Sequence, residues 1–305
     1  MLNDIVKNLL SEVAGLIPTT GAFNIRNNGK SEGRSSSENI DIVPKEGGKG
    51  LDIYVKPFTK NEDVHIPALV TADGVHDVAY NDFHIGEGAE ITIIAGCGIH
   101  NCGCDDSVHE GIHTFYLGKN SKLIYLEKHI GEGDGTGKRI INPQTHIIAE
   151  ENSYIEMDTV QIKGVDSTKR ISSAQLADGA TMIIREKIMT HGDQFAETSF
   201  DVDLNGTGSS AKLISRSVAR DHSRQLFRSR INGNAECYGH SECDAIIMDK
   251  GIVAAEPEIT ANHVDASLIH EAAIGKIAGD QLTKLMTLGL TEKEAEAQII
   301  NGFLK

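Results

Sequence analysis

The segment Ala89-Glu-Ile-Thr-Ile93 decides the fold, because its order of a small residue, a polar residue and a short apolar strand recurs along the chain. Each copy follows a turn that carries Gly or Asn. A repeat in the range of about 20 to 50 residues indicates a solenoid or a propeller. The other copies begin at Ser121, Ser153, Ala180, Ala211, Ala235 and Ala266, with successive spacings of 32, 32, 27, 31, 24 and 31 residues.

Each repeat has room for two or three short strands and contains no apolar stripe of helical length. These features predict an all-β solenoid, a right-handed parallel β-helix in which each strand pairs with its equivalent in the next coil. A β-propeller is the competing fold, although its blades usually need more residues. A left-handed hexapeptide helix is excluded because no six-residue period is present.

The N-terminal part of the chain differs from the repeats. Residues 2–17 place apolar groups on a helical stripe that Pro18 ends, so residues 1–17 are predicted as an N-terminal helix. Residues 18–85 are predicted as an irregular or β lead-in, whose first part, up to residue 50, indicates loops with one short strand. The β-helix core is expected to occupy residues 86–268.

The C-terminal residues 269–305 are predicted as a helical subdomain. Apolar groups over 270–288 follow a helical stripe, and Gly289 is placed to end that helix. Thr291 and Glu294 form a capping box, which predicts the start of a second helix. The expected result is a helical hairpin after the solenoid.

Composition excludes several classes of protein. The 305 residues contain 44 acidic and 29 basic side chains, and this acidic balance argues against a nucleic-acid partner. The longest apolar runs are far shorter than the ~20 residues needed to cross a bilayer, and no signal peptide is visible at the N-terminus. Five cysteines, an odd number, indicate thiols or metal ligands in a cytoplasmic protein.

Three thiols and three imidazoles lie within the 17 residues from Cys97 to His113. They form a possible metal or cluster site, although the Cys spacing matches no standard zinc or ferredoxin pattern. The alternative is a Gly-rich turn with incidental Cys and His. The six candidate ligands are Cys97, His100, Cys102, Cys104, His109 and His113.

The run His109-Glu110-Gly-Ile-His113 formally satisfies the zinc-protease motif H-E-x-x-H, which leaves a metal-dependent hydrolase as an alternative function. That chemistry needs a helix, whereas Gly111 and the apolar residues that follow favour a strand. A strand places both histidines on one side and removes Glu110 from them.

Five arginines between residues 216 and 230 all have even numbers, so on a single strand they would share one face. We expect these arginines to pair with carboxylates, or to hold an anionic intermediate.

A second thiol–imidazole pair lies further along the chain. Cys243 and His270 are 27 residues apart, about one repeat, so stacked coils could bring them close together. Thiolate, imidazole and the neighbouring Glu271 carboxylate suit metal-cluster chemistry. The alternative is a buried cysteine and a histidine at the start of a helix.

The segments around Cys243 and His270 also carry a resemblance. The runs Glu242-Cys-Asp-Ala-Ile-Ile-Met248, His270-Glu-Ala-Ala-Ile-Gly275 and Ile299-Ile-Asn-Gly-Phe303 resemble the C-terminal signature of the SufB/SufD family. These proteins are scaffold subunits of the SUF iron–sulfur cluster assembly system. The similarity covers roughly residues 85–305, and the turn motif at 97–113 looks like that of short, ancestral-type members.

The resemblance implies a parallel β-helix, C-terminal helices that dock the ABC-type ATPase SufC, and a dimer through the β-helix. It implies that the nascent cluster forms at that interface, from a SufB cysteine and a SufD histidine. Cys243 and His270 occupy these two positions, with Glu271 beside them, so we expect a homodimer to replace the heterodimer. The ATPase-docking positions are Ile277, Leu282, Leu285, Met286, Ile299, Ile300 and Phe303.

The expected function is therefore that of a scaffold, without catalytic residues, that holds a transient iron–sulfur cluster. A sulfur donor and cluster acceptor proteins are the further partners that the resemblance implies. Two alternatives stay open: the metal-dependent hydrolase, and a purely structural solenoid adaptor that binds the ATPase but never holds iron.

Overall fold

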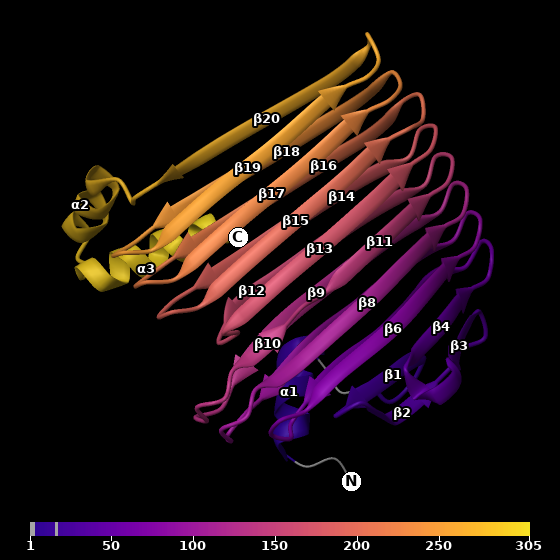
Figure 1. Cartoon of the computed structure of the whole chain (residues 1–305), viewed down its shortest axis with the longest axis horizontal. Coiled ribbons are helices and arrows are strands. Elements are labelled where there is room, and N and C mark those ends of the chain that lie inside the picture. Colours follow the sequence, from indigo (N-terminus) through magenta and orange to yellow (C-terminus); the bar gives the residue numbers. More distant parts are fainter. Residues whose placement is uncertain (1–3, 16–17) are drawn as a thin grey trace.

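The computed structural model describes residues 4–15 and 18–305, and 59% of its residues lie in β-strands. These strands form a parallel β-solenoid of about 8 turns with one N-terminal helix and two C-terminal helices (Figure 1). The predicted fold class is thus confirmed. The ends of the predicted N-terminal helix, at residues 1–3 and 16–17, lie outside the described residues.

Each coil contributes one strand to each of two sheets, and β11 and β10 together fill one position in sheet B. Sheet A contains β2 (Lys30–Ser35), β1 (Ala22–Asn27), β5 (Lys60–Val70), β7 (Glu90–His100), β9 (Lys122–Glu132), β12 (Tyr154–Lys163), β14 (Thr181–Thr190), β16 (Ser209–Ala219), β18 (Cys237–Ile247) and β20 (Ala266–Gly275), in spatial order. Sheet B contains β19 (Ile252–Ala261), β17 (Arg224–Gly233), β15 (Phe195–Leu204), β13 (Ser167–Leu176), β10 (Arg139–Ile141) with β11 (Gln144–Ala149), β8 (Ser107–Leu117), β6 (His76–Ile85), β4 (Gly50–Val55) and β3 (Ile40–Pro44). Neighbouring strands are parallel, except that β1 with β2 and β3 with β4 are antiparallel.

The lead-in region is more regular than the sequence indicates. Residues 18–50 contain the strands β1, β2 and β3 and a short 3-10 helix (Glu46–Gly48), in place of loops with one strand. Parallel stacking already includes β5 and β6, which precede residue 86, and continues through β20 to Gly275.

The turns before β7, β9, β12, β14 and β16 explain why the repeat carries Gly or Asn. Asn120 and Asn152 both have a φ of 57°, and Gly88, Gly179 and Gly208 have positive φ at the equivalent positions. Gly adopts this left-handed conformation without strain, and Asn tolerates it better than most residues. The residue that follows is small and almost fully buried at the entry to the strand.

The strand register corrects two of the seven predicted repeat positions. Ala211 and Ala235 each lie two residues from the true equivalents, Ser209 and Cys237. With this correction the last three spacings, from Ala180 to Ala266, are 29, 28 and 29 residues. A shift of two residues leaves the inward-facing side of a strand unchanged, which is why the error does not alter the predicted fold.

The solenoid interior holds one continuous apolar core that extends from Ala22 to Cys243. Side chains at equivalent positions of successive coils stack on one another, as the rings of Phe83 and Phe115 do with centroids 4.5 Å apart. The stacking follows from the in-register parallel pairing of the coils.

Helix α1 (Asp4–Ala14) packs on the outer face of sheet A. Leu9 joins a separate apolar cluster with Ile25 of β1 and Leu69 of β5. Gly96 permits this close approach, because a Cβ there would lie 2.7 Å from Cγ1 of Val13.

The predicted helix over 270–288 is wrong in its first half, where residues 266–275 form β20 and stack on β18. Helix α2 spans Gly279–Thr287, and Gly289 follows it with a φ of 96°, as expected for a residue that ends a helix. Helix α3 (Glu292–Phe303) begins with the predicted capping box, in which Oγ1 of Thr291 accepts a hydrogen bond from the Glu294 amide. Among residues 4–15 and 18–305, none of the helices combines the length and apolar character that crossing a bilayer requires.

The turn conformation generates the first prediction. Asn152→Ala should lower the free energy of unfolding by about 1–2 kcal/mol, because alanine is strained at positive φ. Asn152→Gly is the matched control and should retain the stability of the unsubstituted chain. The thermal midpoint followed by circular dichroism measures both variants, and equal midpoints would contradict this account of the turn.

Candidate thiol and metal-ligand sites

Cys243 and His270 lie on adjacent strands and on the same face. His270 of β20 pairs in register with Ser241 of β18, and Cys243 is two residues further along β18. Side chains two residues apart on a strand share a face, so the thiol and the imidazole both belong to the solenoid interior. Cys243 is only 2% exposed, whereas His270 is exposed because β20 ends sheet A and no coil covers it.

The third member of this predicted group points the other way. Glu271 pairs in register with Glu242 and therefore lies on the outer face of β20. Its carboxylate is 3.9 Å from Nε2 of His240. Within one chain, Cys243 and His270 thus share a face of neighbouring strands, two register positions apart, and Glu271 lies on the opposite side of the sheet.

The six candidate ligands between Cys97 and His113 do not form a single site. The side chains of Cys97, His109 and His113 are buried in the interior. Cys102 and Cys104 are exposed in the loop after β7. There Sγ of Cys102 is 3.1 Å from Nε2 of His100. Nδ1 of His100 is 3.2 Å from the Glu132 carboxylate. His100 and Glu132 thus lie beside this loop, at the ends of β7 and β9.

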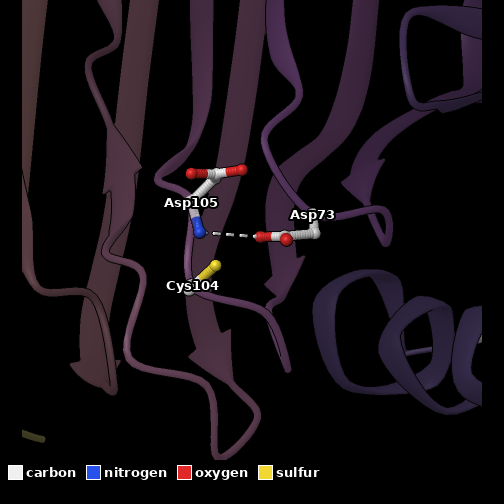
Figure 2. Close-up of side chains that lie close together, drawn as sticks. All are labelled: Asp73, Cys104 and Asp105. Atoms are coloured by element: carbon white, nitrogen blue, oxygen red, sulfur yellow. Dashed lines mark hydrogen bonds between the residues drawn. The ribbon is translucent and has the colours of Figure 1, made fainter.

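Cys104 belongs to a separate exposed group with Asp73 and Asp105, shown in Figure 2. One potential ligand atom from each of the three residues lies within 4.8 Å of the others. The Asp105 amide donates a hydrogen bond of 3.1 Å to Oδ1 of Asp73, which orders the loop. Sequence analysis missed Asp73 because it precedes the Cys-rich segment by one coil.

The H-E-x-x-H residues lie on strand β8 rather than on a helix. His109 and His113 face the interior, and Glu110 faces outward, where it is 3.4 Å from Nε2 of His76. A glutamate on the opposite face of the sheet cannot serve as the general base for a metal held by these histidines. The geometry therefore gives no support to the hydrolase alternative.

A row of polar side chains runs through the interior of sheet A. In register across β9, β12, β14, β16 and β18, one inward position is occupied in turn by Glu127, Thr159, Glu186, Ser215 and Cys243. The preceding inward position in the same strands is mostly apolar, with Tyr125, Met157, Ile184, Leu213 and Ser241. Along each of these strands, the inward side chains therefore change from mostly apolar to mostly polar at the same register position.

Arg170 of β13 neutralises this row from the opposite sheet. Its Nη1 lies 2.7 Å from Oε2 of Glu127, and its Nε lies 3.6 Å from Oε1 of Glu186. Thr198 and Ser215 also donate hydrogen bonds of 2.8 and 2.9 Å to Glu186. All of these side chains are buried, so the group must satisfy its charges internally.

The two carboxylates respond differently to the shared arginine. Burial acts to raise the pKa of Glu127, but the close positive charge of Arg170 and the His129 ring outweigh it and hold the pKa well below its usual range. Burial raises the pKa of Glu186, and Arg170 offsets this effect only in part. The pKa of Cys243 is raised to about 12, first by burial and then by the charges of Glu186 and Asp244, so its thiol is protonated at neutral pH.

The arginines between residues 216 and 230 do not share one strand face, because the turn between β16 and β17 separates them. Arg228 nevertheless forms ion pairs with Glu197 at 2.6 Å and with Glu256 at 2.7 Å. Arg230 pairs with Asp201 in the same way. For these two residues the expected pairing with carboxylates is confirmed.

The docking positions predicted on the C-terminal segment differ in exposure. Met286 is exposed and Ile300 is buried. The other five are partly exposed: Ile277, Leu282, Leu285, Ile299 and Phe303.

Comparison with known proteins identifies a family for most of the chain. Residues 70–303 match the family model described as the SUF system FeS cluster assembly, SufBD core domain. A protein of Archaeoglobus fulgidus named "Iron-sulfur cluster assembly SufBD family protein" is 32% identical over 221 residues, which are 72% of this chain and 58% of that protein.

Two further relatives carry the same family name. One, a homolog from Methanothermobacter thermautotrophicus, is 28% identical over 76% of this chain and 56% of its own length. Another, from Methanocaldococcus jannaschii, is 26% identical over 87% of both chains. The chain thus spans little more than half the length of the first two relatives and most of the third.

The buried charges generate the second prediction. Arg170→Met should lower the free energy of unfolding by about 3–5 kcal/mol, because it leaves Glu127 and Glu186 unpaired in the interior. Adding Glu127→Gln and Glu186→Gln to the Arg170→Met variant should restore much of the lost free energy of unfolding.

Arg228→Met is the matched control, since it removes an exposed arginine that also pairs with two carboxylates. Its loss of stability should be much smaller, because water and salt screen an exposed ion pair. Thermal and urea unfolding of the variants measures the difference, and similar losses for Arg170→Met and Arg228→Met would refute the assignment of the buried group.

Proposed function

The chain belongs to the SufBD family of the SUF system for iron–sulfur cluster assembly, and from this premise we propose that it is a scaffold on which a transient cluster is built. Iron and sulfide are the substrates of this assembly, and the protein supplies their ligands. The observation that carries the proposal is the placement of Cys243 and His270 on one face of adjacent strands at the open end of the solenoid.

A thiol and an imidazole are suitable ligands for iron–sulfur chemistry. Cys243 binds iron as a thiolate, so metal binding must displace the proton that its raised pKa retains. His270 is exposed and offers a nitrogen ligand from the next coil. Glu271 supplies a carboxylate on the outer face of the same strand, where it can contact a second subunit.

The burial of Cys243 requires movement before iron can reach it. Ala272 of β20 is its register neighbour in the last coil. We propose that an ABC-type ATPase of the SufC kind binds α2 and α3, and that ATP-driven motion displaces the last coil. The exposed or partly exposed apolar side chains of these helices, such as Met286 and Leu285, form the docking surface.

The open end of the solenoid is suited to self-association. β19 and β20 end their sheets, so each presents an unpaired strand edge. Ile259 faces inward from β19 and pairs in register with the fully buried Ile231 of β17. Ile259 itself is 44% exposed. A homodimer formed end to end covers these groups and brings two Cys243–His270 pairs together.

Other features are consistent with the scaffold assignment. All five cysteines are free thiols, and the reducing cytoplasm, in which we place the protein, would keep them available as ligands. ATP hydrolysis belongs to the partner, so the chain itself acts without catalytic residues. A sulfur donor must supply sulfide, and acceptor proteins must remove the finished cluster. A purely structural adaptor, the remaining alternative, differs in that it never holds iron.

The third prediction separates the scaffold from the adaptor. Anaerobic incubation of the chain with ferrous iron and sulfide should produce the visible absorption of a cluster, and Cys243→Ser should abolish it. Cys237→Ser is the matched control, because Cys237 is also a buried, inward-facing thiol of β18 and should not be needed. An unchanged spectrum for Cys243→Ser removes this residue from the site.

The fourth prediction concerns the interface. Mass measurement in solution should find a dimer, and Ile259→Asp should shift it to the monomer. Ile148→Asp, at a residue that is 42% exposed on β11, introduces the same charge away from the open end and should leave the dimer intact. A chain that stays monomeric, also with the ATPase bound, would count against the homodimer.

A further inference from the structure

Four outward side chains form a row across the outer face of sheet B, each at the last position but one of its strand. In register, the row contains Tyr54 of β4, His84 of β6, Tyr116 of β8 and Ile148 of β11 (Figure 1). The three rings stack, with centroids 4.6 Å apart between Tyr54 and His84 and 4.9 Å apart between His84 and Tyr116. We call this row of four residues the outer ladder.

In-register stacking explains the contacts within the outer ladder, but it leaves the outer edges of these side chains in water. Tyr54, Tyr116 and Ile148 are 45%, 38% and 42% exposed. A groove of about 290 Å³ lies beside all four residues. Single exposed apolar side chains are ordinary, whereas a contiguous group that borders a groove is typical of a surface that another molecule covers.

The turn after β4 adds a second observation. Phe58 has a φ of 61°, in the left-handed region that bulky residues rarely adopt, and its side chain is 67% exposed. Its ring lies over Gly88 of the next coil, where a Cβ would be 2.6 Å from Cδ1 of Phe58. Neither this backbone conformation nor this exposure stabilises the isolated chain. A strained and exposed aromatic side chain four residues after Tyr54 therefore indicates contact with another molecule.

Exposed carboxylates lie at both ends of the outer ladder. On β3, Asp41 is exposed and pairs in register with Tyr54. Lys56, in the turn after β4, directs its Nζ to the carbonyl oxygen of Glu38 at 2.6 Å. At the β11 end, Glu150 is exposed and lines the groove. From β3 to β11 the surface therefore changes from acidic to aromatic and apolar, and then back to acidic.

Lys119 does not neutralise the β11 end. It donates a hydrogen bond of 3.1 Å to Glu151. The pKa of Lys119 is raised, first by that hydrogen bond and further by the charges of Glu150 and Glu87. Three carboxylates share one lysine here, so this group of four residues carries two net negative charges. Such a surface is complementary to a partner that carries positive charge.

The width of the surface sets the size of the partner segment. Four strand-to-strand steps separate Asp41 on β3 from Ile148 on β11, which is about 19 Å at the usual spacing of strands. An extended chain rises about 3.3 Å per residue, so about six residues are enough to cross from one acidic end to the other.

We propose that the outer ladder and Phe58 bind an extended segment of a partner protein, with apolar side chains in its centre and lysine or arginine at both ends. The apolar centre covers the ring edges, and the basic ends pair with Asp41 and with Glu150. The Cys243–His270 pair and the helices α2 and α3 lie at the other end of the solenoid (Figure 1). This binding surface is therefore additional to the proposed scaffold function and does not depend on it.

The probe is a pair of synthetic peptides of equal composition, labelled for fluorescence anisotropy and added to the full chain. One has leucines in the centre and arginines at both ends, and the other has the arginines in the centre. The first should bind about tenfold more tightly, because only its order of side chains matches the surface. Equal affinities would show no more than attraction between opposite net charges. That result, or no binding of the first peptide, overturns the proposal.

Two variants test the aromatic part of the surface. Tyr116→Ser should weaken binding of the first peptide about tenfold, and Tyr238→Ser is the matched control, at a tyrosine 42% exposed on β18 of the other sheet. Phe58→Gly relieves the strain at positive φ, so it should weaken binding while the thermal midpoint is retained or rises. Unchanged binding in both variants would overturn the proposal and leave the stacked rings a role in stability alone.

Glu150→Lys tests the acidic end against a control of equal net charge. It should weaken binding of the first peptide about tenfold, whereas Glu236→Lys, at an exposed glutamate in the turn before β18, should bind normally. Equal losses in the two variants would contradict the assignment of the acidic ends, because net charge alone would then explain the attraction.

Ile148→Asp and Ile259→Asp distinguish this surface from the proposed dimer interface. Ile148→Asp should weaken binding of the peptide and leave the dimer intact, and Ile259→Asp should do the reverse. Failure of one proposal therefore does not imply failure of the other. A shift of Ile148→Asp to the monomer would show that a second copy of the chain, and not a basic segment, covers the outer ladder.

Discussion

In-register stacking of parallel coils is the constraint on which the rest of this structure depends. Each inward side chain lies against its equivalents in the coils before and after, at the spacing of neighbouring strands. An inward polar side chain therefore needs a polar neighbour in the next coil, or another group that hydrogen-bonds to it or neutralises its charge. The row from Glu127 to Cys243 is the result, and Arg170 is the charge from the other sheet that makes it tolerable.

The regular features of the fold could be predicted from sequence because they repeat. Positive φ at Asn120 and Asn152, followed by a small buried residue, is a local feature that five successive coils share. Alternation with a period of two likewise predicts that the side chains of Glu110 and His109 lie on opposite faces of the sheet. The prediction was wrong where a helical and a strand period fit the sequence equally well. The alanines and isoleucine of residues 270–275 suit a helix, but they form a strand that pairs with the otherwise unpaired edge of β18.

The buried charge group could not be predicted in the same way. Arg170, Glu127 and Glu186 are far apart in sequence, and each is a single charged residue among the inward positions of its strand. The signal that could find them is a charge at a position where the alternation demands an apolar side chain. Deciding that they form one group requires the register of both sheets, which the approximate repeat did not provide.

The coils in the middle of the solenoid and the coil at its end differ in stability. Strands β7 and β8 have stacked coils on both sides, and α1 packs on β7, so opening this region must break many contacts (Figure 1). His270 lies in the last coil, which is stacked on one side only, and a terminal repeat is held by one interface instead of two. Local opening costs least at such ends. A ligand that must be exchanged is therefore best placed at β20, where the last coil can open without disturbing the interior coils.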